Sequence, residues 1–448
     1  MPNVTDGHKL ENPTQEARLQ SAVGAQKPFF KNLVANMLRP SVRQAAVVIA
    51  DQGFCSIAHF LTGVLVARAC SKAEFGIYVV GFTLLTTAMS IQANLCGTPY
   101  TVFSPSLDSK DRKFYLGSTL IQHLAVSFLA TVGFIIAAAV VFTTGRTDSF
   151  AGVLLALGVA SGFILLQDFM RYVLLAQLRV WASLLMGLAV SGFTVGMLFW
   201  AYVGQWLTAS VAYFIMAGCS GLPVLFVLLR ERKQIAFATN KLRQHLKENW
   251  KFGKWLIAHT GVFFFSAHVF MWFLIGLRDA SEAGVYGICV SAGAILNPLL
   301  VGIFNYLGPK AAHAACNGFR EIQRQVFTSM VMVIIIMSIA IFFVYQYGEL
   351  FIVKLYGMKY IGTGTYLTIY FLSVIFAAES ALINAGLNAM KKPSALLASQ
   401  SWGLVFTLSI GLCLVYEWGI LGAVIGITLS KLVVVVYKLS AFRALREC

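Results

Sequence analysis

The hydrophobic positions of this chain fall into twelve long apolar stretches, arranged as two sets of six. A transmembrane helix needs about 20 apolar residues, whereas a barrel strand needs only about 10. The pattern therefore predicts an all-α integral membrane protein with about twelve transmembrane helices. The expected spans are 44–67, 76–103, 116–142, 151–176, 182–203 and 208–229, followed by 254–277, 284–307, 327–346, 366–390, 395–416 and 420–440.

The polar stretches between these spans divide the chain into two six-helix lobes. We expect an N-terminal lobe at 44–230 and a C-terminal lobe at 254–442, with cytoplasmic tails at 1–43 and 443–448. The basic linker 231–253 joins the lobes on the cytoplasmic side. It places Leu242, Leu246 and Trp250 at helical spacing among Lys and Arg residues. This spacing fits either a basic amphipathic helix on the inner leaflet or an ordinary positively charged loop.

Short sequence matches indicate that the two halves are repeats. The segment Lys72–Tyr78, between the first and second spans, reads almost like Ala280–Tyr286 at the equivalent place in the second half. Both carry Glu, Gly and an aromatic residue in the same order. Further along, Asp168 and Ser183 match Glu379 and Ser394. Because six spans restore the original orientation, we expect a pseudo-two-fold axis along the membrane normal.

Composition and charge support a membrane location and set the orientation. The chain is 58% hydrophobic and 12% charged, whereas soluble domains carry about 25% charged residues. Most Lys and Arg residues fall on one side of the predicted spans, including those from Lys431 onward. The other side holds Arg68, Lys72, Arg146, Arg278, Lys354 and Lys359. The positive-inside rule then places both termini in the cytoplasm, and the net charge of +16 reflects topology and attraction to anionic lipid, not nucleic-acid binding.

Motifs for enzymatic chemistry are missing from the sequence. The eight cysteines are scattered, with no CxxC pair, so neither a metal site nor a disulfide framework is indicated. There is no P-loop, HExxH, GxSxG or Gly-rich dinucleotide turn. We therefore expect no cofactor, no ATP hydrolysis by this chain, and no enzyme activity.

Polar residues form stripes within the apolar spans. The helical period places them on one face of each helix, and we expect these faces to line a central cavity, because they have no other way to avoid lipid. The first-half stripes contain Asp51, Gln52, Cys55, Ser56, His59 and Thr62, then Thr83, Thr86, Thr87, Ser90, Asn94, Gly97 and Thr101. The second half offers His259, Thr260, His268, Ser291, Asn297 and Asn305.

Ionisable residues at membrane depth are functional candidates, because an unpaired charge there is costly. Asp51 and Glu379 are the candidate ion-coupling residues. Asp51 either lines the cavity or reaches headgroup water, and the Thr and Ser stripes either line the cavity or let helices pack closely. The histidines have the same two possibilities. Asp168 and Arg171 are spaced as a structural ion pair.

The opening of the chain resembles the Wzx-type polysaccharide flippases of the multidrug/oligosaccharidyl-lipid/polysaccharide exporter superfamily. The residues that carry the resemblance are Ala50-Asp51-Gln52-Gly53, Leu65-Val66-Ala67-Arg68, Ala73-Glu74-Phe75-Gly76-Ile77-Tyr78 and, in the second half, Glu282-Ala283-Gly284-Val285-Tyr286. The resemblance implies two lobes in a V around a central cavity in the cell inner membrane. It also implies alternating access that moves an undecaprenyl-diphosphate-linked oligosaccharide to the periplasmic leaflet for polysaccharide or lipopolysaccharide biosynthesis. Membrane lipid and a polysaccharide polymerase or export machinery are the further implied partners.

A substrate of this kind assigns roles to the polar residues. An anionic diphosphate requires cations, for which the candidates are Arg68, Arg278, His59, His259 and His268, and a glycan requires hydrogen-bonding walls, for which they are Thr87, Asn94 and Asn305. A cation-coupled multidrug exporter of the same superfamily is the alternative. A membrane-bound glycan polymerase or acyltransferase is a third reading, but it needs a large extramembrane loop, and none is obvious.

Overall fold

The structure is a computed structural model that describes residues 40–144, 148–296, 300, 318–390 and 393–444. Residues 51–448 form one compact unit, and residues 1–50 belong to a second. All contacts discussed below join residues of the larger unit. The predicted N-terminal tail, except for its last few residues, lies outside the described part of the chain.

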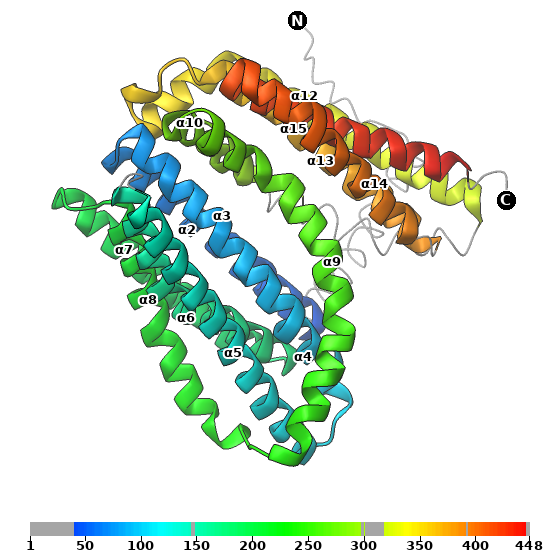
Figure 1. The fold of residues 1–448 in the computed structure, drawn as a ribbon. Helices are drawn as coiled ribbons and strands as arrows, with labels where there is room; N and C mark the ends of the chain where they lie inside the picture. The colour runs from blue at the N-terminus through cyan, green and yellow to red at the C-terminus, as the bar shows by residue number, and fades with distance from the viewer. Residues whose placement is uncertain (1–39, 145–147, 297–299, 301–317, 391–392, 445–448) are drawn as a thin grey trace, which may run out of the picture. The chain divides into compact units, whose positions relative to one another are not determined.

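Helices make up all the regular structure of the described residues, which confirms the predicted fold class (Figure 1). The first-half helices are α2 (Pro40–Ala69), α3 (Lys72–Gln92), α4 (Thr98–Phe103), α5 (Ser109–Thr143), α6 (Asp148–Ala176), α7 (Val180–Val203) and α8 (Ala209–Glu231). A π-helical turn, Ala93–Gly97, joins α3 to α4. The second-half helices are α9 (Thr239–Leu277), α10 (Ala280–Gly293), α12 (Phe319–Tyr356), α13 (Gly364–Ala389), α14 (Pro393–Phe406) and α15 (Leu412–Ala444).

Nine helical stretches among the described residues are long and apolar enough to cross a membrane. One of them, Ala395–Ala444, has 50 residues and covers two of the predicted spans. Inside it, Gly419 has φ 54° and ψ −127°, which is not helical, so the chain turns between the two spans. The predicted span 284–307 begins in α10 and continues beyond the described residues. The multi-span architecture is thus confirmed, whereas the count of twelve stays a prediction.

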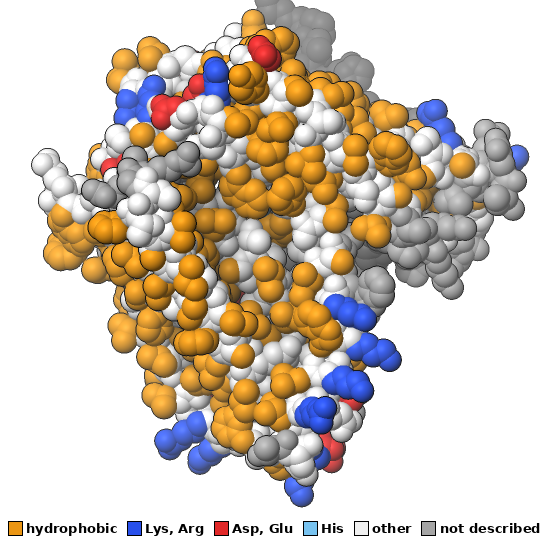
Figure 2. Space-filling model, viewed as in Figure 1, with side chains coloured by type: hydrophobic (Ala, Val, Ile, Leu, Met, Phe, Trp, Pro, Cys, Tyr) orange, Lys and Arg blue, Asp and Glu red, His pale blue; other side chains and the backbone are white. Residues whose placement is uncertain are grey.

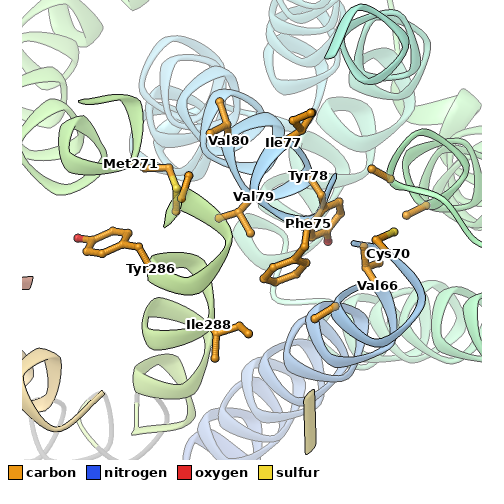
Figure 3. Close-up of a cluster of buried hydrophobic side chains, with 14 of the residues drawn as sticks. Val66, Cys70, Phe75, Ile77, Tyr78, Val79, Val80, Met271, Tyr286 and Ile288 are labelled. Atoms are coloured by element: carbon orange, nitrogen blue, oxygen red, sulfur yellow. The ribbon is translucent and has the colours of Figure 1, made fainter. Parts of the chain in front are cut away.

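The repeated motif brings α3 and α10 into backbone contact. A Cβ atom added to Gly76 would lie well under 3.0 Å from the Ala280 carbonyl oxygen, and one added to Gly284 would lie well under 3.0 Å from the Lys72 carbonyl oxygen. Each glycine thus faces the residue four positions before the other glycine. Such reciprocity is the mark of a two-fold-related contact, which fits the predicted repeat. Around it, apolar side chains of α2, α3, α9 and α10 pack together, including Val66, Val79, Met271 and Ile288 (Figure 3).

The glutamate of each motif caps another helix of its own half. Glu74 accepts a hydrogen bond from the backbone N–H of Ala209, the first residue of α8, at 2.9 Å. Glu282 accepts one from the N–H of Ile420, directly after the turn at Gly419, at 2.8 Å. The first amides of a helix have no partner within the helix and carry partial positive charge. Each motif therefore fixes the start of a helical segment in its own half, α8 in the first and the part of α15 after Gly419 in the second.

The linker does not form a separate domain. After a short turn at Arg232–Gln234, α9 runs without interruption from Thr239 to Leu277, so most of the predicted linker and the first predicted span of the second half are one helix. At 39 residues and 1.5 Å per residue, α9 is about 58 Å long. Its apolar C-terminal part alone is long enough for a hydrocarbon core of about 30 Å.

Candidate functional site

A buried ion pair lies within the first half. The Asp51 carboxylate of α2 is 2.8 Å from the guanidinium of Arg171 on α6, and Ser183 of α7 donates a hydrogen bond to it at 3.4 Å. Asp51 is 1% exposed, and its carboxylate packs against Gly187, where there is no room for a Cβ. The counterion of Arg171 is therefore Asp51, whereas the sequence pattern had paired Arg171 with Asp168. Residues of α6 and α7 therefore hold the Asp51 carboxylate of α2.

The threonine stripe of α3 forms hydrogen bonds mainly with its own helix. Thr86 and Thr87 both donate to the Thr83 carbonyl oxygen, at 2.9 and 2.8 Å. Thr83 is buried and accepts a hydrogen bond from the indole N–H of Trp272 on α9 at 3.0 Å. Asn94 is half-buried in the π-helical turn. Within this stripe, Thr83 therefore contacts the neighbouring helix α9. The Thr87 hydroxyl donates its proton within α3, and its oxygen can still accept a hydrogen bond.

The candidate histidines differ in their surroundings. His59 on α2 is exposed and lies edge-on to Phe82 of α3, with ring centroids 5.9 Å apart. His268 on α9 is half-buried, with its ring centroid 5.4 Å from that of Phe264. The side chain of His259 and the whole of Asn305 lie outside the described residues. His59 and His268 therefore stand in different halves of the chain.

Two lysines of α15 bring positive charge into the second half. The sequence pattern had counted Lys431 and the cations after it as cytoplasmic. In the structure Lys431 is half-buried, and its ammonium lies 5.3 Å from the centre of the Phe263 ring of α9. His268 lies five residues after Phe263 on the same helix. Lys438, two turns further along, is fully buried and donates a hydrogen bond to Ser380 of α13 at 2.6 Å.

A signal for these lysines was present in the sequence. The predicted span 420–440 already contains both cations, and apolar residues continue past Lys431, through Val433–Val436 to Phe442, so both could have been assigned to the helix instead of the cytoplasmic side. The spacing of seven residues places Lys431 and Lys438 on one face of the helix.

Glu379 neighbours this group. It precedes Ser380 on α13 and is 3% exposed. Neither of its carboxylate oxygens has a hydrogen-bond partner among the described residues. An ionisable group buried at membrane depth without a partner is a functional candidate, whereas Asp51 is held in an ion pair.

Arg68 and Lys359 connect the two halves near the repeated motif. The Arg68 guanidinium, at the end of α2, donates to the carbonyl oxygens of Leu355, at 2.6 Å, and Lys354, in the last turn of α12. In return, the Lys359 ammonium donates to the carbonyl oxygens of Arg68, at 3.2 Å, and Cys70. Burial lowers the pKa of the Lys359 ammonium and raises that of the Cys70 thiol to about 12. We call these contacts the Arg68–Lys359 bridge.

Arg278, the second-half counterpart of Arg68, binds its own half. It donates to the carbonyl oxygen of Tyr416 at 3.4 Å and lies 3.7 Å from the Glu282 carboxylate. Both arginines are exposed, and both bind helix-end carbonyl oxygens. The structure therefore separates them from His268, with which the sequence analysis had grouped them as candidate cations for the diphosphate.

No protein-family model matches the sequence, and no curated protein matches it. Solved structures do match in fold. An inward-facing multidrug resistance MATE family transporter of the MOP superfamily superposes with a TM-score of 0.70, at 13% identity, over 88% of this chain and 96% of that one. The lipid II flippase MurJ, in an inward closed conformation, gives 0.70 at 14% identity, over 89% and 87%. An outward-facing MATE family transporter gives 0.61 at 11% identity, over 91% and 96%.

These likenesses cover most of every chain compared. The shared fold agrees with the all-helical architecture and with the helices long enough to cross a membrane. At such low sequence identity, no residue role is transferred to this chain. The chain shares its fold with these solved membrane transporters.

Proposed function

We propose that the chain is a transporter that flips a polyprenyl-diphosphate-linked oligosaccharide across the cytoplasmic membrane by alternating access. The fold supports a transporter, and one observation supports an anionic substrate. Lys431 of α15 lies against the ring of Phe263 on α9 at membrane depth, and His268 follows five residues later on the same helix. A diphosphate in a low-dielectric cavity is held out by several kcal/mol unless cations meet it. Lys431 with His268 is the proposed headgroup contact.

The remaining polar groups fit the rest of such a substrate. The polyprenyl tail stays in lipid, and the glycan needs donors and acceptors along its path. His59 is exposed, and Thr87 and Asn94 are half-buried. We propose that these three first-half residues contact the glycan, opposite the cationic second half.

The Arg68–Lys359 bridge and the contact of Gly76 with Gly284 are the contacts that break and form during alternating access. In the orientation that the charge pattern predicts, both contacts lie at the helix ends on the non-cytoplasmic side of the membrane. The higher similarity to the inward-facing transporter than to the outward-facing one supports a state closed on this side. Opening outward then requires both contacts to separate. That step frees the Arg68 guanidinium, and we propose that Arg68 and Arg278 meet the diphosphate only as it leaves.

Surface glycan in a flippase-deletion strain tests the proposal. We expect Lys431→Gln to reduce the surface glycan at least about tenfold, equivalent to ~1.4 kcal/mol, at unchanged protein level, and Lys431→Arg to keep most of it. Lys233→Gln removes an exposed cation in the turn after α8 and serves as the matched control. Full complementation by a Lys431→Gln, His268→Ala double variant would overturn the assignment of the headgroup contact.

A cation-coupled multidrug exporter is the second candidate, and the buried carboxylate of Glu379 favours it. Coupling by this residue requires it to gain and lose a proton or cation during transport. We expect Glu379→Gln to abolish drug resistance conferred by the chain if the exporter reading holds. If the chain is a flippase, the wild-type protein confers no drug resistance, and Glu379→Gln changes only glycan export.

A further inference from the structure

The first part of α9 presents two opposite faces, and one of them is docked on α5. Asn249 is fully buried; it accepts a hydrogen bond from the Tyr115 hydroxyl at 2.6 Å and donates one to the Gln122 side chain at 2.8 Å. One turn earlier, the His245 ring lies 2.9 Å from the Ser118 hydroxyl oxygen.

An ion pair completes this contact at the start of α9. The Lys241 ammonium lies 2.5 Å from the Asp111 carboxylate of α5. Lys241, His245 and Asn249 recur every four residues, so they share one helix face. Polar contacts along that face fix the rotation of this part of α9 about its own axis.

That rotation decides which residues point away from α5. At 100° per residue, Arg243, Lys247, Trp250 and Lys251 fall within an arc of about 100° that is centred opposite the docked face. All four are exposed, and Trp250 retains 56% of its surface. Among the described residues, none of these three cations forms an ion pair. Figure 2 shows Lys and Arg side chains gathered along the edge where α9 runs in Figure 1.

The acidic residue of this stretch does not neutralise the face. Glu248 lies off the cationic arc and accepts a hydrogen bond from Gln244 at 2.9 Å. The exposed face thus combines three cations with one large amphipathic ring, and it directly precedes the apolar part of α9. This combination is the one that binds at a membrane surface, with Trp at headgroup level and Lys and Arg on anionic lipid.

We infer that the face formed by Arg243, Lys247, Trp250 and Lys251 is a binding surface for anionic phospholipid headgroups. Docking on α5 holds the face in place, so lipid binding requires no folding of the segment. The surface is independent of the substrate carried, and it stands whether or not the proposed transport function is correct.

Quenching of Trp250 fluorescence tests the inference in the full-length protein. The protein is reconstituted into vesicles that contain either brominated phosphatidylglycerol or brominated phosphatidylcholine, and the Trp250 signal is taken as the difference from Trp250→Phe. We expect stronger quenching by the brominated phosphatidylglycerol, since each cation near an anionic surface contributes roughly fivefold to binding. The preference should weaken at 1 M salt, where the Debye length is about 3 Å.

Charge variants decide whether the face itself selects the lipid. We expect Arg243→Gln, Lys247→Gln and Lys251→Gln together to equalise quenching by the two lipids. Lys110→Gln, Arg232→Gln and Lys233→Gln together remove the same charge from exposed positions off this face and should preserve the preference. Equal quenching in the wild type, no Trp250 quenching by either lipid, or a preference that survives the triple substitution on α9 would each overturn the inference.

Discussion

Gly76 of α3 and Gly284 of α10 face each other so closely that neither position has room for a Cβ, because each lies against the carbonyl oxygen four residues before the other. The same short motif supplies Glu74 and Glu282, which cap α8 and the last part of α15. One repeated segment therefore performs two tasks in each half: its glycine joins the halves, and its glutamate orders the helices within a half.

Gly284→Ala should force α3 and α10 apart, because its new Cβ would overlap the Lys72 carbonyl oxygen. Overpacking of this kind costs about 1–3 kcal/mol, and we expect a lower thermal unfolding midpoint in detergent. Gly192→Ala, on α7, is the control, since nothing lies within 4 Å of its Cβ and alanine favours a helix by up to about 1 kcal/mol. An equal midpoint for both variants would contradict the close contact.

Glu282→Ala should destabilise the start of the last helical segment by about 0.5–2 kcal/mol, the usual cost of losing a helix N-cap. The expected readout is faster proteolysis near Gly419 and a lower unfolding midpoint. Glu417→Ala removes an exposed glutamate on the same helix and should change neither. Glu74→Ala is expected to produce the corresponding effect at the start of α8.

Asp51→Asn tests whether the buried ion pair is structural. Removing the carboxylate charge leaves Arg171 uncompensated, which costs up to 3–5 kcal/mol for a fully buried pair; we expect about 3 kcal/mol, because the Arg171 side chain keeps 19% exposure. The double variant Asp51→Asn, Arg171→Gln should recover much of the stability. A stable single variant that has lost only transport would instead assign Asp51 to ion coupling.

The Arg68–Lys359 bridge predicts how Cys70 reacts. With the bridge closed, burial raises the pKa of the Cys70 thiol from about 9 to about 12, so the reactive thiolate is about a thousandfold scarcer at neutral pH. Alkylation of Cys70 should therefore be slow at pH 7 and accelerate as pH rises toward 12.

Opening of the bridge should remove this protection. We expect Arg68→Ala to expose Cys70, lower the pKa of its thiol toward 9 and increase its alkylation rate at pH 8, as measured by mass spectrometry of the labelled peptide. The exposed Cys413 is the internal control and should react at the same rate in both proteins. An unchanged Cys70 rate in Arg68→Ala would show that the bridge does not cover the thiol.

The hydropathy pattern alone determined the helical architecture, because each apolar stretch must satisfy its backbone hydrogen bonds within lipid. Short sequence matches between the halves located the repeated Glu–Gly motif, and both copies follow the first span of their halves. What the motif does could not be read from the sequence. A glycine can mark a turn, a flexible site or a close helix contact, and only the packing of α3 on α10 selects the last.

Tertiary structure likewise decided which charges belong together. Arg171 lies three residues from Asp168 in the sequence, yet the carboxylate that it pairs with is that of Asp51, on another helix. By sequence, Lys431 and Lys438 count as cations of the cytoplasmic side, whereas the structure places them on α15 beside α9 and α13. Helical periodicity fixes the face on which a residue lies, but the partner opposite that face depends on how distant segments pack. Local pattern therefore determined the elements of this protein, and long-range packing determined its charge pairs and its candidate site.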